Sequence, residues 1–221
     1  MRNLPLKSFK KIFRLTVFFA LIAASSLFGE TQSHTLSPAD TEIVKHDATS
    51  YTLSIDPSSP GLQLKVTPPP GTYTLGSYYK QFQAKTSPIL EYIPTGETFD
   101  NWSSIFTIDQ SSLSTAQSSP NLSAQHITGL ISWISTQARK VSLIHHETVV
   151  KKDFSISKAA IQYQLHDGKC ELLYAEYYCK GKTVCGIQYT EKLIQWINSS
   201  EAQKETDKIS KKVEGLLSVV G

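Results

Sequence analysis

Three cysteines, Cys170, Cys179 and Cys185, carry the most reactive side chains of this 221-residue sequence. Cys179 and Cys185 flank the turn-like run KGKTV. If residues 181–183 form the loop, the two cysteines sit opposite each other across a hairpin. This spacing predicts a Cys179–Cys185 disulfide, with Cys170 on the preceding strand as the alternative partner, and leaves one thiol over.

Zinc binding and nucleophilic catalysis are two alternatives to a disulfide for these cysteines. A structural zinc site needs about four ligands at short spacing, whereas the sequence offers the three cysteines and His166 without a CxxC pair. A catalytic cysteine needs a histidine close in space, and nothing in the spacing selects one. We therefore rank a disulfide first, three unpaired thiols second and a zinc site last.

Histidines, carboxylates and tyrosines also form suggestive groups. The run His145-His146-Glu147 looks like part of a metal site, but adjacent residues of a strand point to opposite faces, so it is interpreted as a polar strand. Paired carboxylates would need the fold to bring them together; the candidates are Asp100, Asp109, Glu171 and Glu176. The tyrosines suit a carbohydrate or peptide platform, but strand cores are favoured; they are Tyr73, Tyr78, Tyr79, Tyr174, Tyr177 and Tyr178.

Familiar catalytic and cofactor motifs are absent from the sequence. It has no GxSxG nucleophile elbow, no GxxxxGK[ST] phosphate loop, no GxGxxG fingerprint and no HExxH pair. We therefore predict no catalytic, cofactor-binding or metal-binding residues. The balance leans against an enzyme, although dispersed carboxylates leave that question open.

Residues 1–29 have the order of a secretory signal peptide. Five basic residues without an acidic one precede the apolar run LTVFFALIAA, and small residues follow it. The alternative is an uncleaved anchor, but residues 15–29 fall short of the about 20 residues that span a membrane. The sequence predicts export to the periplasm or beyond, and no stable membrane span after cleavage.

All of the basic excess of the sequence belongs to this leader. The chain has 22 Lys and Arg against 19 Asp and Glu, and residues 1–29 hold five of the former and none of the latter. The remainder therefore has a formal charge of −2. No later stretch shows the basic clustering with aromatic residues that nucleic-acid binding requires.

Alternating apolar residues predict a hairpin over 51–67 and strands at 88–93, 104–109, 141–151, 159–165 and 170–178. An apolar stripe predicts a helix over 122–140 with Ser123 as its cap, and Arg139 and Lys140 in its last turn. Asp167-Gly168 predicts a two-residue turn that places Leu165 opposite Cys170.

A helical region is expected from residue 190 to the end. Leu193, Ile194 and Ile197 would form its core face, and Ser200 with Gln203 a capping box for a second helix. Residues 201–208 are almost wholly polar and need not pack, so we expect either one long helix with a solvated middle or two helices in series. A second apolar stripe follows and is a candidate interaction surface for a partner; it comprises Ile209, Val213, Leu216 and Leu217.

The order of strands, helix, strands and helix predicts an α+β fold, with an antiparallel sheet packed against helices. We divide the chain into a signal peptide (1–29), a flexible mature N-terminus (30–50), the α+β domain (51–200) and a C-terminal helical extension (201–221).

Two segments, EYIPTGETFDNWSSIFTI (91–108) and IQYQLHDGKCELLYAEYY (161–178), support a resemblance. They are similar to a group of small uncharacterised exported proteins of Gram-negative bacteria. The element order resembles the PsbP-like fold, an α/β/α sandwich used by extrinsic lumenal subunits and by a Ran-binding family. The resemblance covers about residues 91–200 and implies a fold rather than an activity.

These observations favour an exported, non-catalytic module that binds an unknown protein or envelope partner. The first alternative is a periplasmic hydrolase that uses dispersed carboxylates or Cys170, and it needs a cleft where those groups converge. The second alternative is a small-ligand carrier, which needs an apolar pocket between sheet and helix.

Overall fold

The computed structural model describes residues 51–54, 63–82, 85–98, 101–112, 121–151, 154–181 and 183–220. The predicted signal peptide and the flexible segment 30–50 lie outside these residues. Two helices and ten strands follow in the order β1 (Tyr51–Ser54), β2 (Gln63–Val66), β3 (Thr72–Phe82), β4 (Lys85–Pro94), β5 (Ser104–Ser112), α3 (Leu122–Gln137), β6 (Ala138–Val150), β7 (Ser155–Leu165), β8 (Cys170–Lys180), β9 (Thr183–Leu193), α4 (Ser199–Glu214) and β10 (Leu217–Val220).

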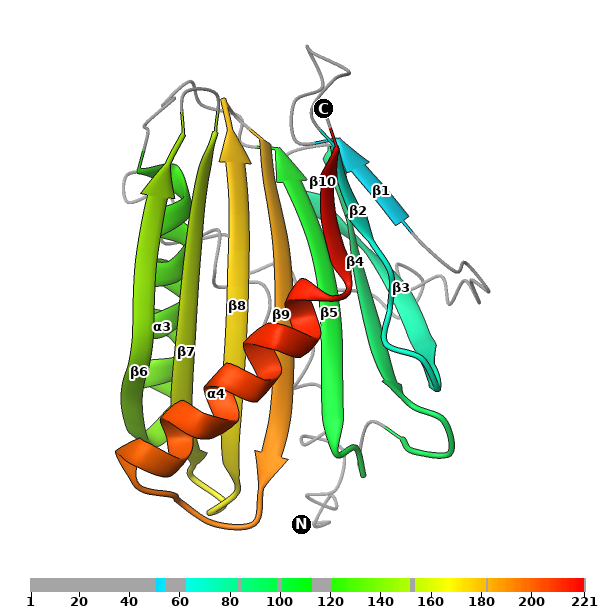
Figure 1. Cartoon of the computed structure of the whole chain (residues 1–221). Coiled ribbons are helices and arrows are strands. Elements are labelled where there is room, and N and C mark those ends of the chain that lie inside the picture. Colours follow the sequence, from blue (N-terminus) through cyan, green and yellow to red (C-terminus); the bar gives the residue numbers. More distant parts are fainter. Residues whose placement is uncertain are drawn as a thin grey trace, which may run out of the picture.

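Seven of the described strands form one sheet in the order β3-β4-β5-β9-β8-β7-β6, and each neighbouring pair is antiparallel. The two helices pack against opposite faces: α3 lies behind the sheet and α4 crosses its front diagonally (Figure 1). The predicted α+β class with an antiparallel sheet between helices is therefore confirmed.

Strand β8 shows why this sheet needs a helix on both faces. Its residues from Cys170 to Cys179 are all buried. Alternate side chains enter different cores: Tyr174 and Tyr178 pack on the α4 side, whereas Leu173 and Tyr177 pack on the α3 side. The expectation that these tyrosines are core residues is thus confirmed for 174, 177 and 178.

Helix α3 is shorter than predicted. It ends at Gln137 because Ala138 is already extended, and Arg139 and Lys140 belong to β6 instead of the last helical turn. Ser123 is not the cap. Its buried hydroxyl lies 2.9 Å from the hydroxyls of both Ser155 and Ser157, so contacts to β7 take the side chain away from the helix end. The apolar stripe of the helix is buried as expected.

Both hairpins around β8 differ from the predicted register by one residue. Leu165 N–H donates to Lys169 O, and Gly168 has φ +90°, so the turn has three residues instead of two. Gln164 therefore faces Cys170, where Leu165 was expected. At the next turn Lys180 pairs with Thr183, leaving two residues in a loop that was expected to hold three.

The second register difference corrects the predicted disulfide. Cys179 pairs with Val184 and packs on the α3 side, whereas Cys185 pairs with Tyr178 and packs on the α4 side. Cys170 lies at the other end of β8, opposite Leu193. No disulfide joins any of the three, because side chains on opposite faces or opposite ends of a sheet cannot meet the short distance that a bridge requires.

The C-terminal region also differs from the prediction. Residues 190–193 extend β9, and Ile194, expected in the core, is fully exposed. Helix α4 begins later, with Asn198 and Glu201 forming the capping box assigned to Ser200 and Gln203. Buried Gln162 fixes the connection: its amide accepts from Ile197 N–H at 2.9 Å and donates to Ile197 O at 3.3 Å in the orientation that satisfies both.

The apolar stripe expected to await a partner is part of the core. Ile209 and Val213 are buried on the inner side of α4, and Leu216 and Leu217 pack partly buried against the same cluster. The polar run 201–208 is helical, and it packs through Ala202 and Thr206. This segment covers one face of the sheet, so it cannot offer the stripe as a free docking surface.

A second sheet of three short strands, in the order β1-β2-β10, lies beside α4 on the same face (Figure 1). The predicted hairpin over 51–67 is confirmed by the antiparallel register Leu53↔Leu64. Residues 217–220 form strand β10 where a helix was expected, and this strand pairs with β2. Leu64 and Val66 are fully buried and pack in the core with α4.

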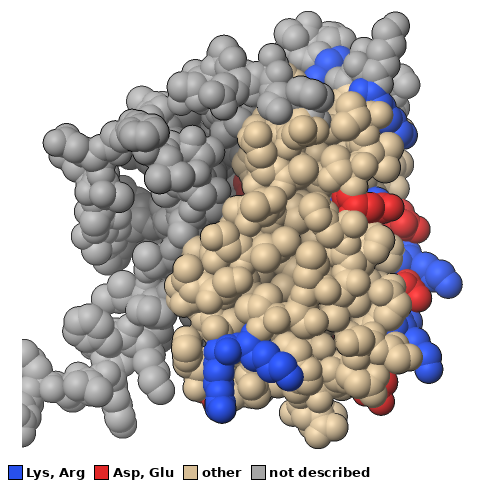
Figure 2. Space-filling model, turned by 90° about the vertical axis from the view of Figure 1, so that its left-hand side faces the viewer, with Lys and Arg blue, Asp and Glu red and all other residues tan. Residues whose placement is uncertain are grey.

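Charge is distributed unevenly over the molecule. Helix α3 contains no Lys, Arg, Asp or Glu. In the view onto the β6 edge, the centre shows no charged side chain, and charged residues gather along one margin and at the lower end (Figure 2). Among the described residues, no helix is long and apolar enough to cross a membrane.

Candidate functional site

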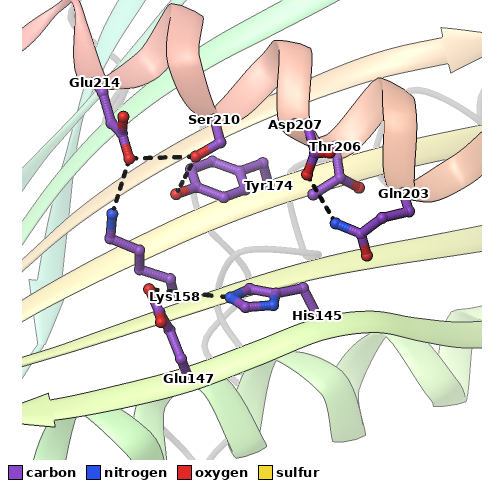
Figure 3. A pocket seen from close by; sticks show the side chains of 9 residues that line it. All are labelled: His145, Glu147, Lys158, Tyr174, Gln203, Thr206, Asp207, Ser210 and Glu214. Carbon is purple, nitrogen blue, oxygen red and sulfur yellow. Dashed lines mark hydrogen bonds and ion pairs between the residues drawn. The ribbon is translucent and has the colours of Figure 1, made fainter.

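A polar hollow of about 220 Å³ lies between α4 and the sheet (Figure 3). Four elements provide its walls: β6, β7 and β8 form the floor and α4 the roof. The lining side chains are His145, Glu147, Lys158, Tyr174, Gln203, Thr206, Asp207, Ser210 and Glu214.

The alternation of strands and the period of the helix place these side chains together. Glu147 pairs with Lys158 across β6 and β7, and Lys158 pairs with Glu176 across β7 and β8, so the three lie in one row on the α4 face. The lining residues of α4 recur at intervals of three and four, which is one face of a helix. His146 pairs with Ala159, whose side chain faces α3, so the predicted separation of the two histidines is confirmed.

Glu176 lies on the α4 face of β8, opposite Lys158, and is only 1% exposed. Tyr174 and Tyr178 each donate a hydroxyl hydrogen bond of 2.6 Å to one of its two carboxylate oxygens. The Lys158 ammonium lies 3.2 Å from the same carboxylate and 3.2 Å from that of Glu214. A buried carboxylate is costly unless it is paired and hydrogen-bonded, and these donors meet that need.

The protons of this network are held firmly. Burial alone would lower the pKa of Lys158. The nearby carboxylates of Glu176 and Glu214 favour its charged form more strongly, so its pKa is raised. Burial, and then the charge of Glu176, raises the pKa of both Tyr174 and Tyr178. At neutral pH all three groups therefore keep their protons and act as donors instead of exchanging protons with a substrate.

The hollow itself is left with acceptors. Ser210 donates to the Tyr174 hydroxyl at 3.2 Å, and Gln203 donates to one oxygen of Asp207 at 2.8 Å. Thr206 lines the hollow and is buried, and its hydroxyl has no hydrogen-bond partner among the residues that the structure describes. A buried hydroxyl without a partner costs free energy, so Thr206 marks a place where a ligand group can bind.

The carboxylates considered from the sequence do not converge. Glu176 lies at the hollow, whereas Glu171 accepts a 2.5 Å hydrogen bond from Tyr163 nearer the end of β8. Asp109 lies on β5, opposite Gly186 of β9. Asp100 lies outside the described residues. The paired-carboxylate arrangement of a hydrolase is therefore not formed by Glu171, Asp109 and Glu176.

Several residues of the hollow were missed by the sequence-based prediction. Lys158 and Ser210 carry no motif, and Thr206 and Asp207 lie in the run expected to be solvated. Their spacing was an available signal: positions 203, 206, 207, 210 and 214 share one helical face that carries polar residues throughout. That face points inward only because α4 lies across the sheet.

The cysteines and metal-binding residues offer no comparable site. Burial raises the pKa of the Cys179 thiol and of the Cys185 thiol, so both lack the thiolate that a nucleophile requires. Within the described part of the chain, no group of three or more His, Cys, Asp or Glu residues is placed to hold a metal ion.

On the α3 side, His126 is buried and stacks on the Tyr177 ring with 5.6 Å between ring centroids. Burial lowers its pKa from 6.5 to about 4, so the imidazole is neutral at physiological pH. Tyr177 in turn accepts a 2.9 Å hydrogen bond from Gln188. We assign this group to the core, because its aromatic rings fill the space between α3 and the sheet.

Comparisons with known proteins give only distant likenesses. No family model matches the chain, and no curated protein matches it. The structure is similar to a crystal structure of the Ran-binding protein Mog1p of Saccharomyces cerevisiae, with a TM-score of 0.41, 9% identity and coverage of 80% of this chain and 96% of that one. A point mutant of Mog1 gives a TM-score of 0.40, 10% identity and coverage of 78% and 97%. Neither likeness is close enough to assign a partner or an activity.

Proposed function

We propose that the chain is an exported, non-catalytic binding module of PsbP-like fold, which engages a protein partner through the hollow under α4. The observation that carries this proposal is Thr206, a residue of the lining that is only 3% exposed and whose buried hydroxyl has no hydrogen-bond partner in the described structure. Leaving a buried hydroxyl unsatisfied costs about 1–3 kcal/mol. A partner group that accepts or donates a hydrogen bond there would recover that energy.

Export to the periplasm or the cell exterior is the second part of the proposal. It is supported by the basic, apolar and small-residue order of residues 1–29. Mass spectrometry of the protein recovered from its exporting host tests it. We expect a mass lacking the leader in the exported fraction; full-length protein in the cytosol would exclude export.

A periplasmic hydrolase is the second candidate, since Glu176 is a buried carboxylate beside a hollow. Three donors already occupy it, so it has little capacity left to activate water as a general base. A small-ligand carrier ranks third. The hollow is polar, and its volume falls below the about 300–1,000 Å³ of typical small-molecule pockets.

Site-specific photo-crosslinking in the exporting host tests the binding site. A crosslinking side chain at Gln203, which lines the hollow, should give a discrete protein adduct. The same group at the neighbouring exposed position Lys204 should not. The adduct should disappear in an Asp207→Asn background and persist in Glu205→Gln. Equal adducts from positions 203 and 204 would contradict the proposal that the hollow is the site.

A further inference from the structure

We propose that the hollow under α4 binds the ammonium or guanidinium group of a lysine or arginine side chain that a protein partner inserts. This inference rests on the proposed binding function and names the chemistry of the group that is bound. It follows from three properties of the lining: its charge, its surplus of acceptors and its size.

The lining carries an acidic excess. Glu147, Asp207 and Glu214 stand against Lys158, which gives a formal charge of −2 when His145, whose Nε2 lies 3.9 Å from Glu147, is not counted. Lys158 adds little positive field toward a ligand, because its ammonium lies 3.2 Å from both Glu214 and the buried Glu176. An anionic ligand would meet like charges with no cation left to pair with it.

The main hydrogen-bond donors of the lining already have acceptors within the protein. Tyr174 and Lys158 donate to Glu176, and Gln203 donates to Asp207. The acceptors are in surplus: the Thr206 hydroxyl has no partner in the described structure, and the carboxylates of Glu147 and Asp207 each have two oxygens. Lysine offers three donors and arginine five, and neither accepts. A basic group therefore complements this lining in both charge and hydrogen bonding.

The size and place of the hollow indicate a side chain in preference to a whole metabolite. About 220 Å³ is small for a drug-sized ligand but holds the end of a long side chain. His145 and Glu147 lie on β6, the last strand of the sheet, so the hollow lies next to an edge that a partner can approach (Figure 3). Thr206 lies on the roof, where it can bind the inserted group.

Binding of matched small probes to the full chain tests the inference. We would titrate methylguanidinium, its uncharged near-isostere methylurea, propionate and N-acetyl-arginine-methylamide, and follow the backbone amide NMR signals of residues lining the hollow. Saturable shifts are expected with the two cations only. The arginine diamide should bind more tightly than methylguanidinium, because its aliphatic stem adds contacts along the mouth.

Three variants assign the binding to named side chains, and a fourth serves as their control. Glu147→Gln and Asp207→Asn should each weaken binding of the cations about tenfold, the loss typical of one hydrogen bond to a charged group. Glu205→Gln removes a carboxylate from the same helix outside the lining and should leave binding unchanged. Thr206→Val should weaken binding while raising the thermal unfolding midpoint, because it removes an unsatisfied buried hydroxyl; a lowered midpoint with unchanged binding would contradict this role.

Other outcomes separate this inference from the proposed function. If methylurea binds as well as methylguanidinium, or if propionate binds, the basic-group assignment is overturned while a binding site remains. If methylguanidinium binds as tightly as the arginine diamide, the inferred ligand is a small free cation instead of a partner's side chain, and the inference is overturned. If no probe shifts the lining signals although the Gln203 crosslink forms, the ligand class is wrong and the function stands; absence of both overturns both.

Discussion

Packing within the large sheet leaves no room for a side chain at Gly186. This glycine lies opposite Tyr177 in the β8–β9 pair, and the tyrosine ring covers it. A Cβ added there would lie 2.6 Å from Cε1 of Tyr177, closer than real Cβ contacts come. The ring cannot easily move aside, because it stacks on His126 and its hydroxyl accepts from Gln188.

We therefore expect Gly186→Ala to lower the free energy of unfolding by about 1–3 kcal/mol, the usual cost of overpacking a core. Urea unfolding followed by far-UV circular dichroism measures it. Gly215→Ala is the matched control, because its added Cβ would meet nothing closer than 3.5 Å and its φ of −68° suits alanine. Equal destabilisation by both substitutions would contradict the packing argument.

His126 gives the folded protein a dependence on pH. Its folded pKa, about 4, lies below the 6.5 of the unfolded chain, so falling pH protonates the unfolded state first. The stability contributed by the neutral ring is complete above pH 6.5 and is lost as pH falls toward 4. The loss across this window is about 3 kcal/mol, at about 1.4 kcal/mol for each pKa unit.

Replacement His126→Phe keeps a ring on Tyr177 and removes the titration. The free energy of unfolding of this variant should fall less than that of the wild type between about pH 6.5 and pH 4. Urea unfolding at several pH values provides the comparison. Parallel pH profiles for the two proteins would show that His126 is not the group responsible.

At the scale of elements, the start of α4 is set by its capping box. The Asn198 side chain accepts from Glu201 N–H at 3.1 Å, and Glu201 accepts from Asn198 N–H at 3.3 Å. The pattern Ser200-x-x-Gln203 fits the same motif in sequence. Asn198 is the cap because β9 continues to Leu193 and Gln162 then holds Ile197 in place.

Asn198→Ala should therefore cost about 1 kcal/mol of stability, the typical value for loss of an N-cap. Ser200→Ala should stay within about 0.5 kcal/mol of the wild type, as expected for an exposed position without a special contact. Thermal unfolding of both variants decides between the two boxes, and a larger loss for Ser200→Ala would contradict the observed cap.

Most elements could be predicted because their signals are local. The alternation in 170–178 and the stripe in 122–134 predict a strand and a helix at the observed places. The registers could not be predicted, because a hairpin sequence fits turns that differ by one residue. That single residue places Cys179 and Cys185 on opposite faces of the sheet.

The site was predictable only in part, for a different reason. Glu176, His145 and Glu147 are visible as chemical candidates in the sequence, but Lys158 and Ser210 become relevant only once β7 and α4 meet. Residues 190–193 show the same limit: they have helical character in sequence, yet pairing with Cys170 and Ser104 makes them a strand. Contacts between distant segments outweigh local preference in such cases.

For the whole molecule, the C-terminal region provides part of the core. Ile209 on α4 is 2% exposed and packs in the cluster that also holds Tyr189 and Leu64. Ile194, the residue directly after the end of β9, is fully exposed. Helix α4 thus carries both the polar side chains that line the hollow and the apolar side chains that fill the core. Loss of its packing would therefore disrupt the hollow as well as the fold.

The two isoleucines make a direct comparison. Ile209→Ala should lower the free energy of unfolding by about 2–5 kcal/mol, as large-to-small core substitutions do. Ile194→Ala should change it by less than about 0.5 kcal/mol. Chemical denaturation of both proteins measures the difference. A small effect at Ile209 would mean that α4 is not held against the sheet in solution.

The pairing of β10 with β2 brings residues 217–220 beside residues 63–66. Contacts between segments so distant along the chain form late in folding, because closing the long loop between them costs conformational entropy. The small sheet also consists of strands of four residues each, and short strands resist opening weakly. It should form after the large sheet and open before it, so that its backbone amides exchange with solvent deuterium sooner than those of β8. The part of the fold that forms last is then also the part whose opening first exposes Leu64 and Val66 to water.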